Sequence, residues 1–551
     1  MMMINSVAFS SEPDRQLQEL AAEFWNWRCV TQPAQGDDIP RVERPDGWQP
    51  DFSASAMEAN RQRYVQFRKR LDSLPRDHWS RSDSVDYLCL RSAIERVNWE
   101  LNVLRLPHRN PDFWVHQTLG AVYELLLIHS PMTQQRAENI ILRLESFPKT
   151  IADARENLTE PVAPFAQIAL DNLSLIDQKL TETQKAPEQL IDPALHRRLE
   201  AAINNAITVL QDYSRWLEQN LSAMTGEFRC GREAYVYFLK NIAYIPYSPE
   251  ELLQQGRLEW NRAVAFETYE TLRNKDLPPA ELFKTSAGQI NQAKQDEQAI
   301  RDFLEEKDIM SVPAWLRHYI NKKMPGHIEP LSHMGVVDDL TSETRLDEDA
   351  VAYIPEPGPH LSYFRRACAQ DPRPIIVHEG VPGHYFQMAL SWKNPNPIRR
   401  GYIDSGANEG IGLYVEELLQ QFGLFDDRPR TREIIYNFMR LRALRVEIDI
   451  RLALGTFTIG QAGEYLAQTV PMDRETAIQE AGFFACNPGQ AITYQIGKLQ
   501  ILKFLADARL HLGDRFNLRT FHDYLMLNGN VPIALLRWEY LGLRDEIESF
   551  F

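Results

Sequence analysis

The residues best suited to chemistry lie in PIIVHEGVPGHYFQMAL, residues 374 to 390. His378 is followed directly by Glu379, and a second histidine, His384, comes six positions after the first. Hydrolases commonly hold zinc with three protein ligands and keep a fourth position for water, and a glutamate next to the first histidine can act as general base. The pattern therefore predicts His378 and His384 as metal ligands and Glu379 as the base.

The spacing of the two histidines requires an interruption of the helix. On a straight helix, six positions turn the chain by about 600° and leave the two side chains roughly 120° apart. Pro382 has no backbone N–H to donate to the carbonyl of His378, and Gly383 tolerates a distorted backbone. A bulged or broken turn would bring His384 to the metal, whereas an unbroken helix would present Tyr385 instead, so local geometry decides which side chain reaches it.

A third ligand is expected from NEGIGLYVEELLQQFG, residues 408 to 423, which reads as a helix. Glu409 and Glu416 are seven positions apart and share one face of a segment that is otherwise mostly apolar. Buried carboxylates are costly without a cation or hydrogen-bond donors. We assign Glu409 as the third ligand and Glu416 as a group that orients a ligating histidine.

Around these motifs the sequence predicts a mainly α-helical protein. Helical periodicity recurs before residue 230 and again after 374, and Ser248-Pro249 is a helix-start signal. Residues 324–373 are rich in proline and glycine, and we expect short strands at about 330–373. We divide the chain into an N-terminal helical lobe, 1–230, and a metal-binding catalytic lobe, 231–551, which contains every motif.

Composition excludes several function classes. The chain has 551 residues and a formal net charge of −16, which argues against nucleic acid and against an anionic membrane surface as partner. No apolar run is long enough to span a membrane, and the first residues, MMMINSVAFSSEPDRQ, do not resemble a signal peptide. The five cysteines are far apart and without a CxxC pair, which favours free thiols. A cytoplasmic location is therefore expected.

Three blocks in order, HEGVPGHYFQ, EGIGLYVEEL and NPGQAITYQIGKLQIL, resemble the hallmark blocks of the bacterial "domain of unknown function 885" family. This family is grouped with His-Glu/His/Glu (gluzincin-like) zinc metallopeptidases. The resemblance implies His378, His384 and Glu409 as ligands, with Glu379 as base. It also implies a two-lobed, helical, metallopeptidase-like body with a deep cleft and a small sheet near the metal site.

The third block adds further candidates through the same resemblance. Tyr494 matches a tyrosine placed to stabilise the oxyanion, and Gly489 and Gln490 match the turn before it, with Gln490 a candidate substrate contact. The chain departs from the family pattern after Glu409-Gly410, where Ile411-Gly412 replaces Trp-Ala. It also departs at Tyr385, where the family often has histidine. These departures leave the proposed metal ligands intact and affect substrate recognition.

The sequence thus favours a zinc-dependent hydrolase, most simply a carboxypeptidase, dipeptidase or oligopeptidase that cleaves short peptides with metal-activated water. Mn, Co or Fe would fit the same ligands as zinc. A metal-dependent amidohydrolase acting on a non-peptide amide would use the same ligands. A non-catalytic helical binding protein is the third alternative, although it would have no need of Glu379. Three histidines could be ligands, substrate contacts or ordinary structural residues: His360, His327 and His333. Three arginines could clamp a substrate carboxylate or be ordinary surface residues: Arg400, Arg365 and Arg366.

Overall fold

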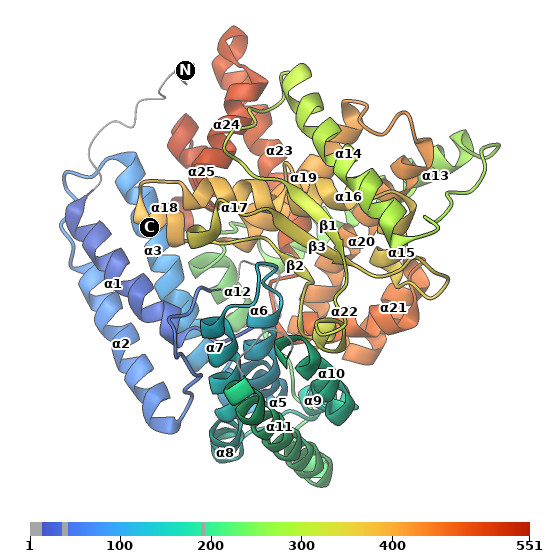
Figure 1. The fold of residues 1–551 in the computed structure, drawn as a ribbon. Coiled ribbons are helices and arrows are strands. Elements are labelled where there is room, and N and C mark those ends of the chain that lie inside the picture. The colour runs from blue at the N-terminus through green and yellow to red at the C-terminus, as the bar shows by residue number, and fades with distance from the viewer. Residues whose placement is uncertain (1–13, 36–41, 189–192, 551) are drawn as a thin grey trace.

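The computed structural model describes residues 14–35, 42–188 and 193–550. Within these residues the chain is mainly helical, with one small sheet near the centre of the molecule, which confirms the fold class predicted from periodicity (Figure 1). The first 13 residues, on which the expected absence of a signal peptide rested, lie outside the described part. None of the described helices is long and apolar enough to cross a membrane.

The sheet has three short strands, β1 (Tyr319–Lys323), β2 (Asp338–Asp339) and β3 (Ala350–Ile354), in the order β1-β3-β2. β1 runs parallel to β3, with Tyr319 opposite Ala350, and β2 pairs antiparallel to β3. Central β3 is buried along its whole length, which explains its continuous apolar run. The strands predicted at about 330–373 therefore need one correction, because β1 precedes residue 330. Its sequence, Tyr-Ile-Asn-Lys-Lys, is too short in apolar residues to be recognised as a strand.

The first three long helices lie along one side of the molecule (Figure 1). They are α1 (Arg15–Thr31), α2 (Ala54–Asp72) and α3 (Arg81–Asn98). Their buried residues, such as Phe24 and Leu88, belong to the same hydrophobic cluster as Phe386, Ile411 and Leu535. The start of the chain is therefore packed against its C-terminal part.

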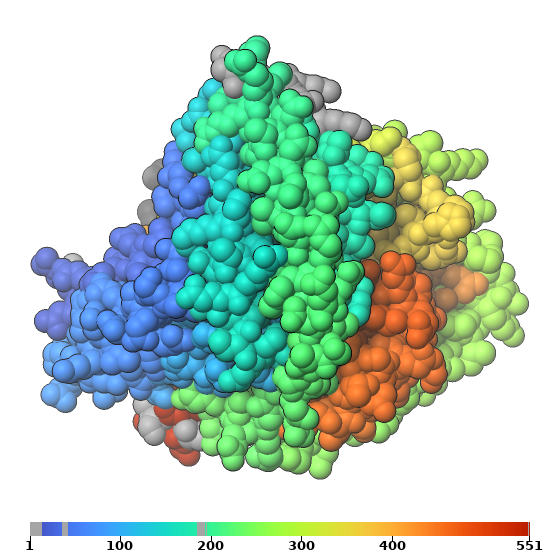
Figure 2. All heavy atoms as spheres, turned by 90° about the horizontal axis from the view of Figure 1, so that it is seen from below, coloured from blue at the N-terminus to red at the C-terminus, as the bar shows by residue number. Residues whose placement is uncertain are grey.

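A second group of N-terminal elements builds its own core. It comprises the π-helix η1 (Trp99–Val103), α4 (Leu106–Arg109), α5 (Pro111–Val115), the π-helix η2 (His116–Gly120), α6 (Ala121–Leu126), α7 (Gln134–Glu145), α8 (Phe147–Asn157), α9 (Ala163–Asn172), α10 (Ile176–Glu188), α11 (Pro193–Asn220) and η3 (Leu221–Ala223). The hydrophobic cluster of this group extends to Leu331, Val351 and Tyr353 near the sheet. Seen from below, these helices cover much of the face, beside the orange segment that contains α21 and α22 (Figure 2).

The remaining elements form the larger part of the molecule. They are α12 (Arg232–Asn241), α13 (Pro249–Arg273), α14 (Ser286–Glu306), η4 (Glu329–Met334), η5 (Glu343–Arg345), α15 (Tyr363–Gln370), α16 (Arg373–Ile375), the π-helix η6 (Ile376–Gly380), α17 (His384–Trp392), α18 (Pro397–Gly401), α19 (Ser405–Gln421), α20 (Pro429–Ala453), α21 (Ile459–Thr469), α22 (Arg474–Cys486), α23 (Thr493–Leu512), η7 (Gly513–Arg515), α24 (Leu518–Leu527), α25 (Ile533–Leu541) and η8 (Glu548–Phe550). The start of α13 confirms Ser248 as its N-cap, in a capping box with Glu251.

The boundary between residues 230 and 231 stays a prediction. The hydrophobic clusters cross it in both directions, since α1–α3 pack with the C-terminal helices and the second N-terminal core reaches the sheet. Two surface hollows stand out, one along α2 beside Tyr64 and Arg68, the other around Arg105, Arg109 and Glu160. Neither contains the predicted metal ligands.

Close contact between α19 and α23 fixes the helix that supplies Glu409. A Cβ at Gly410 would lie 2.6 Å from the backbone of Gly497, and a Cβ at Gly497 would overlap the carbonyl oxygen of Gly406. Glycine is required at this crossing because backbone faces backbone, and neither side can move away as a flexible side chain would.

We predict that Gly497→Ala lowers the free energy of unfolding by at least about 1–3 kcal/mol, because the new methyl group forces the two helices apart. The matched control is Gly460→Ala on α21, where an added Cβ meets nothing within 4 Å. The control is expected to be neutral or slightly stabilising. Denaturant unfolding of both variants measures the difference, and equal midpoints would contradict this account of the crossing.

Candidate metal centre

The segment that contains His378 and His384 is interrupted between them. The chain passes from α16 into η6 (Ile376–Gly380), where Val381 N–H donates to Ile376 O at 2.9 Å, and α17 begins at His384. The helix is therefore widened and then broken, as Pro382-Gly383 predicted. Gly383 is required here, because a Cβ at this position would overlap the carbonyl group of His378.

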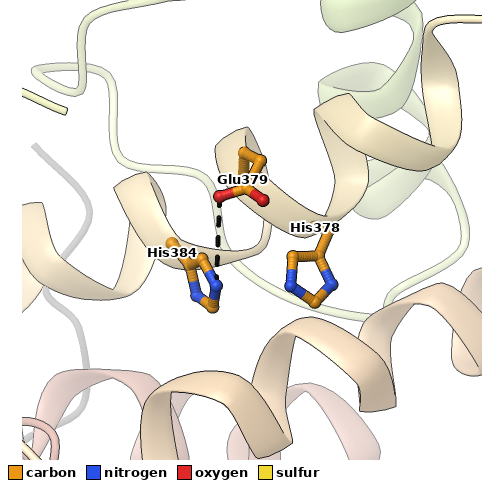
Figure 3. A group of neighbouring side chains, drawn as sticks. All are labelled: His378, Glu379 and His384. Carbon is orange, nitrogen blue, oxygen red and sulfur yellow. Dashed lines mark ion pairs between the residues drawn. The ribbon is translucent and has the colours of Figure 1, made fainter. Parts of the chain in front are cut away.

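This interruption brings the two imidazoles together. Their ring centroids are 4.7 Å apart with planes at 77°, and Figure 3 shows the two rings close together beneath the Glu379 carboxylate. Glu379 Oε2 lies 4.0 Å from His384 Nε2. One ligand atom from each of these three residues lies within 4.8 Å of the others. Tyr385 is instead buried in the core, near Arg301, so His384 joins the group and Tyr385 does not.

Glu409, the predicted third ligand, comes from the first turns of α19 and is fully buried against both histidines. Its Oε2 lies 3.2 Å from His384 Nε2 and 3.5 Å from His378 Nε2. The two histidines and Glu409 thus converge from two separate segments on one point.

The donor atoms at this point lack partners in a way that fits a metal ion. Both nitrogens of His384 and both oxygens of Glu409 are buried without a hydrogen-bond partner among the described residues. Buried polar atoms are almost always hydrogen bonded, so a group of them facing one another needs an explanation. Two imidazoles and one carboxylate form the donor set of many catalytic zinc sites, and these residues fit that ion.

Glu416 and Gly412 hold the first histidine in place. Glu416 Oε1 is 2.6 Å from His378 Nδ1, so the carboxylate keeps a proton on Nδ1 and leaves Nε2 to face Glu409. On the other side, a Cβ at Gly412 would lie only 2.7 Å from His378 Cε1. The departure from the family pattern at residue 412 therefore falls directly against this ring.

The charges of the group perturb one another strongly. Burial by itself would lower the pKa of His384 and of His378, but neighbouring carboxylates raise both pKa values above the usual range. Burial would likewise raise the pKa of Glu409, yet the two imidazoles hold it well below the usual range. Glu409 and the two imidazoles therefore favour one another's charged forms.

Tyr494 lies beside this group at the start of α23. Its ring stacks on His378 with centroids 6.1 Å apart and planes at 16°. The turn before it is held by buried Asp449, which accepts from Gly489 N at 2.9 Å and Ile492 N at 3.2 Å. Gly489 has a φ of +94°, which explains glycine there, and Gln490 is buried in the same turn.

The structure places the other candidate residues in different surroundings. Arg400 pairs with Glu343 at 3.0 Å, and Arg365 donates to Tyr353 O at 2.8 Å. His333 Nε2 lies 3.0 Å from Asn172 O. His360 and Arg366 are exposed, and His327 is partly buried in the turn before η4.

Two arginines near the His378–Glu409 group were not among the residues predicted from the sequence. Arg442 Nη2 lies 3.7 Å from Glu416 Oε1, and the guanidinium carbon of Arg445 lies 4.6 Å from the centre of the Tyr494 ring. Both are on α20 at a spacing of three, which puts them on neighbouring positions of one helix face. That spacing is the only signal in the sequence, and it is common among surface arginines.

These residues lie within a region, residues 33–539, that matches a family model described as bacterial protein of unknown function (DUF885). The chain belongs to this family. The resemblance seen in the three sequence blocks is therefore confirmed for the family itself. No curated protein matches the chain.

Two solved structures share the fold. One, from Shewanella oneidensis, is provisionally described as a lipoprotein of unknown function; it has 14% sequence identity and a TM-score of 0.72 over 97% of this chain and 100% of its own. The other, from Colwellia psychrerythraea, is provisionally described as a lipoprotein; it has 18% identity and a TM-score of 0.74 over 95% of this chain and 98% of its own. At these identities the likeness shows the fold alone.

The descriptions of these structures correct one expectation. A cytoplasmic location was predicted from the first residues and the scattered cysteines, and the description of both neighbours as lipoproteins contradicts it. The physical reason is that neither the first residues nor the spacing of the cysteines determines where the protein resides. Free cysteines that are buried or partly buried can serve as packing residues in any compartment.

We predict a pH-dependent contribution of the Glu409–histidine pair to the stability of metal-free protein. The lowered pKa of Glu409 makes this contribution present above about pH 4.5, the pKa of a free glutamate, and lost at lower pH. The raised pKa values of the histidines make it present below about pH 6.5, the free value, and lost as the pH rises through the folded values.

In the presence of a chelator, Glu409→Gln is therefore expected to lower the free energy of unfolding more at pH 5.5 than at pH 9. The difference is up to about 3–5 kcal/mol, the cost of breaking a buried pair. Denaturant unfolding of the wild type and the variant at both pH values measures this difference. Glu433→Gln, which removes a carboxylate paired with Arg430, is the control. An equal cost of Glu409→Gln at the two pH values would contradict the ion pair.

Proposed function

We propose that the chain is a zinc-dependent hydrolase, most simply a peptidase that cleaves short peptides. The observation that carries the proposal is the convergence of His378, His384 and Glu409 on one point, with Glu379 beside them. The buried donor atoms of His384 and Glu409 have no hydrogen-bond partner among the described residues. This proposal also adopts the assignment of the family to the His-Glu/His/Glu zinc metallopeptidases.

In this proposal each residue has one role. His378, His384 and Glu409 would hold a zinc ion, which would acidify a water molecule and polarise the scissile carbonyl. Glu379 accepts the proton of the attacking water and returns it to the leaving amine. The hydroxyl of Tyr494 donates a hydrogen bond to the developing oxyanion, and Glu416 keeps the His378 ring in its orientation.

Access to the site supports a small substrate. The side chains of the ligands are almost fully buried, whereas that of Glu379 is 24% exposed. The group is therefore open to solvent on the side of Glu379. The proposal includes a two-lobed body with a deep cleft, which would admit short peptides and exclude folded proteins.

We predict about one zinc ion per chain in the native protein, the stoichiometry of a three-ligand site, and its loss in His378→Ala. Glu379→Gln is expected to keep its zinc and to lose at least about 100-fold in the hydrolysis of a dipeptide panel, because it lacks only the base. Mass spectrometry of native protein and the panel assay measure the two results.

Each outcome of this experiment has a distinct meaning. Protein that binds no zinc, even after zinc is added back, contradicts the hydrolase and leaves a helical binding protein. Zinc binding with no activity on any dipeptide, but with activity on a non-peptide amide, replaces the peptidase by an amidohydrolase.

We further predict that Glu416→Gln weakens zinc binding by about 10–100-fold, because His378 loses the charged partner that fixes its orientation. Competition with a chelator of known affinity measures the change. Glu417→Gln is the neighbouring control, since Glu417 is bonded to Lys498 rather than to a histidine. Equal zinc affinities of the two variants would contradict the role of Glu416.

A further inference from the structure

Arg442 is a buried cation with unused hydrogen-bond donors. It is 4% exposed, and its Nε and Nη1 atoms are buried without a hydrogen-bond partner among the described residues. Its nearest carboxylate is Glu416, at 3.7 Å from Nη2. That distance is too long for a hydrogen bond, so Arg442 interacts with this carboxylate only through its charge.

The carboxylates around Arg442 are already engaged elsewhere. Glu416 is bonded to His378 at 2.6 Å. Glu480 is bonded to the neighbouring arginine on α20, Arg445. The carboxylate closest to Arg442 therefore serves a proposed metal ligand and gives Arg442 no hydrogen bond. Burying a guanidinium with unused donors is costly, and a bound anion would offset that cost.

Arg442 is also adjacent to the proposed reaction centre. Its guanidinium carbon lies 5.7 Å from the centre of the Tyr494 ring, which stacks on His378. Phe438 and Phe364, at 4.8 and 5.7 Å, form apolar walls around the same guanidinium. Apolar walls reduce competition from water and strengthen a charge-assisted hydrogen bond.

We propose that Arg442 binds a carboxylate of the substrate, so that the site takes peptides or amides with a free carboxylate close to the bond that is cleaved. The planar guanidinium matches a carboxylate in a bidentate arrangement. This inference rests on the proposed function and makes it more specific. It assigns the carboxylate contact to Arg442 in place of Arg400, Arg365 and Arg366, of which the first two have other partners and the third is exposed.

The test uses full-length Glu379→Gln loaded with zinc, in which turnover is blocked. Calorimetric titration compares the dipeptide Gly-Phe with its C-terminal amide. The acid is expected to bind about tenfold more tightly than the amide, the value of one charge-assisted contact. When Arg442→Gln is added, the affinity for the acid is expected to fall to that for the amide, and the affinity for the amide is expected to stay the same.

Two further variants accompany this measurement. Arg442→Lys keeps the charge without the planar fork and is expected to retain part of the preference, which covers the case that Arg442→Gln does not fold. Arg451→Met is the matched control on the same helix. Its guanidinium pairs with Glu447 at 2.7 Å, and it is expected to leave the preference intact.

Several results would overturn the inference. The first is that Glu379→Gln binds the acid no more tightly than the amide, or binds neither. The second is that the acid keeps the same advantage over the amide when Arg442→Gln is added. Loss of zinc in Arg442→Gln would show that Arg442 serves Glu416 and not the substrate. Failure of the proposed function is separate, because it appears as zinc-free protein in the parent itself.

Discussion

The arrangement around the histidines depends on two carboxylates buried on one helix. Glu409 and Glu416 are both fully buried on α19, and each needs a cationic or donor partner. His378 is placed between them, with Nδ1 toward Glu416 and Nε2 toward Glu409. This one ring is therefore hydrogen-bonded to Glu416 and faces Glu409, and its position depends on how closely η6 approaches α19.

That approach is possible because small residues line the helix. Gly412 leaves room for the His378 ring, and Gly410 leaves room for the backbone of α23 on a different side of α19. The same helix thus touches the first histidine and the helix that supplies Tyr494. Crowding at either glycine would change the distances among all the groups of the site.

Much of the centre follows from local sequence. The interruption at Pro382-Gly383 was predictable because proline removes a backbone donor and glycine permits the close approach to the His378 carbonyl. Glu409 and Glu416 were recognisable because seven positions on a helix return to the same face. The surroundings of the candidate arginines were not predictable, because the pairing of Arg400 with Glu343 and the bond of Arg365 to Tyr353 O form only in the folded chain.

The sequence by itself determined the helical class, the cap at Ser248, the broken turn between the histidines and the residue types available to hold a metal, because each depends on neighbours within a few positions. Tertiary structure alone decided that α1–α3 pack with the C-terminal helices, that β1 joins β3, and that Arg442 and Arg445 lie beside Glu416 and Tyr494. These contacts join segments with no local signal in common. They form only when burial of the whole apolar surface fixes the helices against one another.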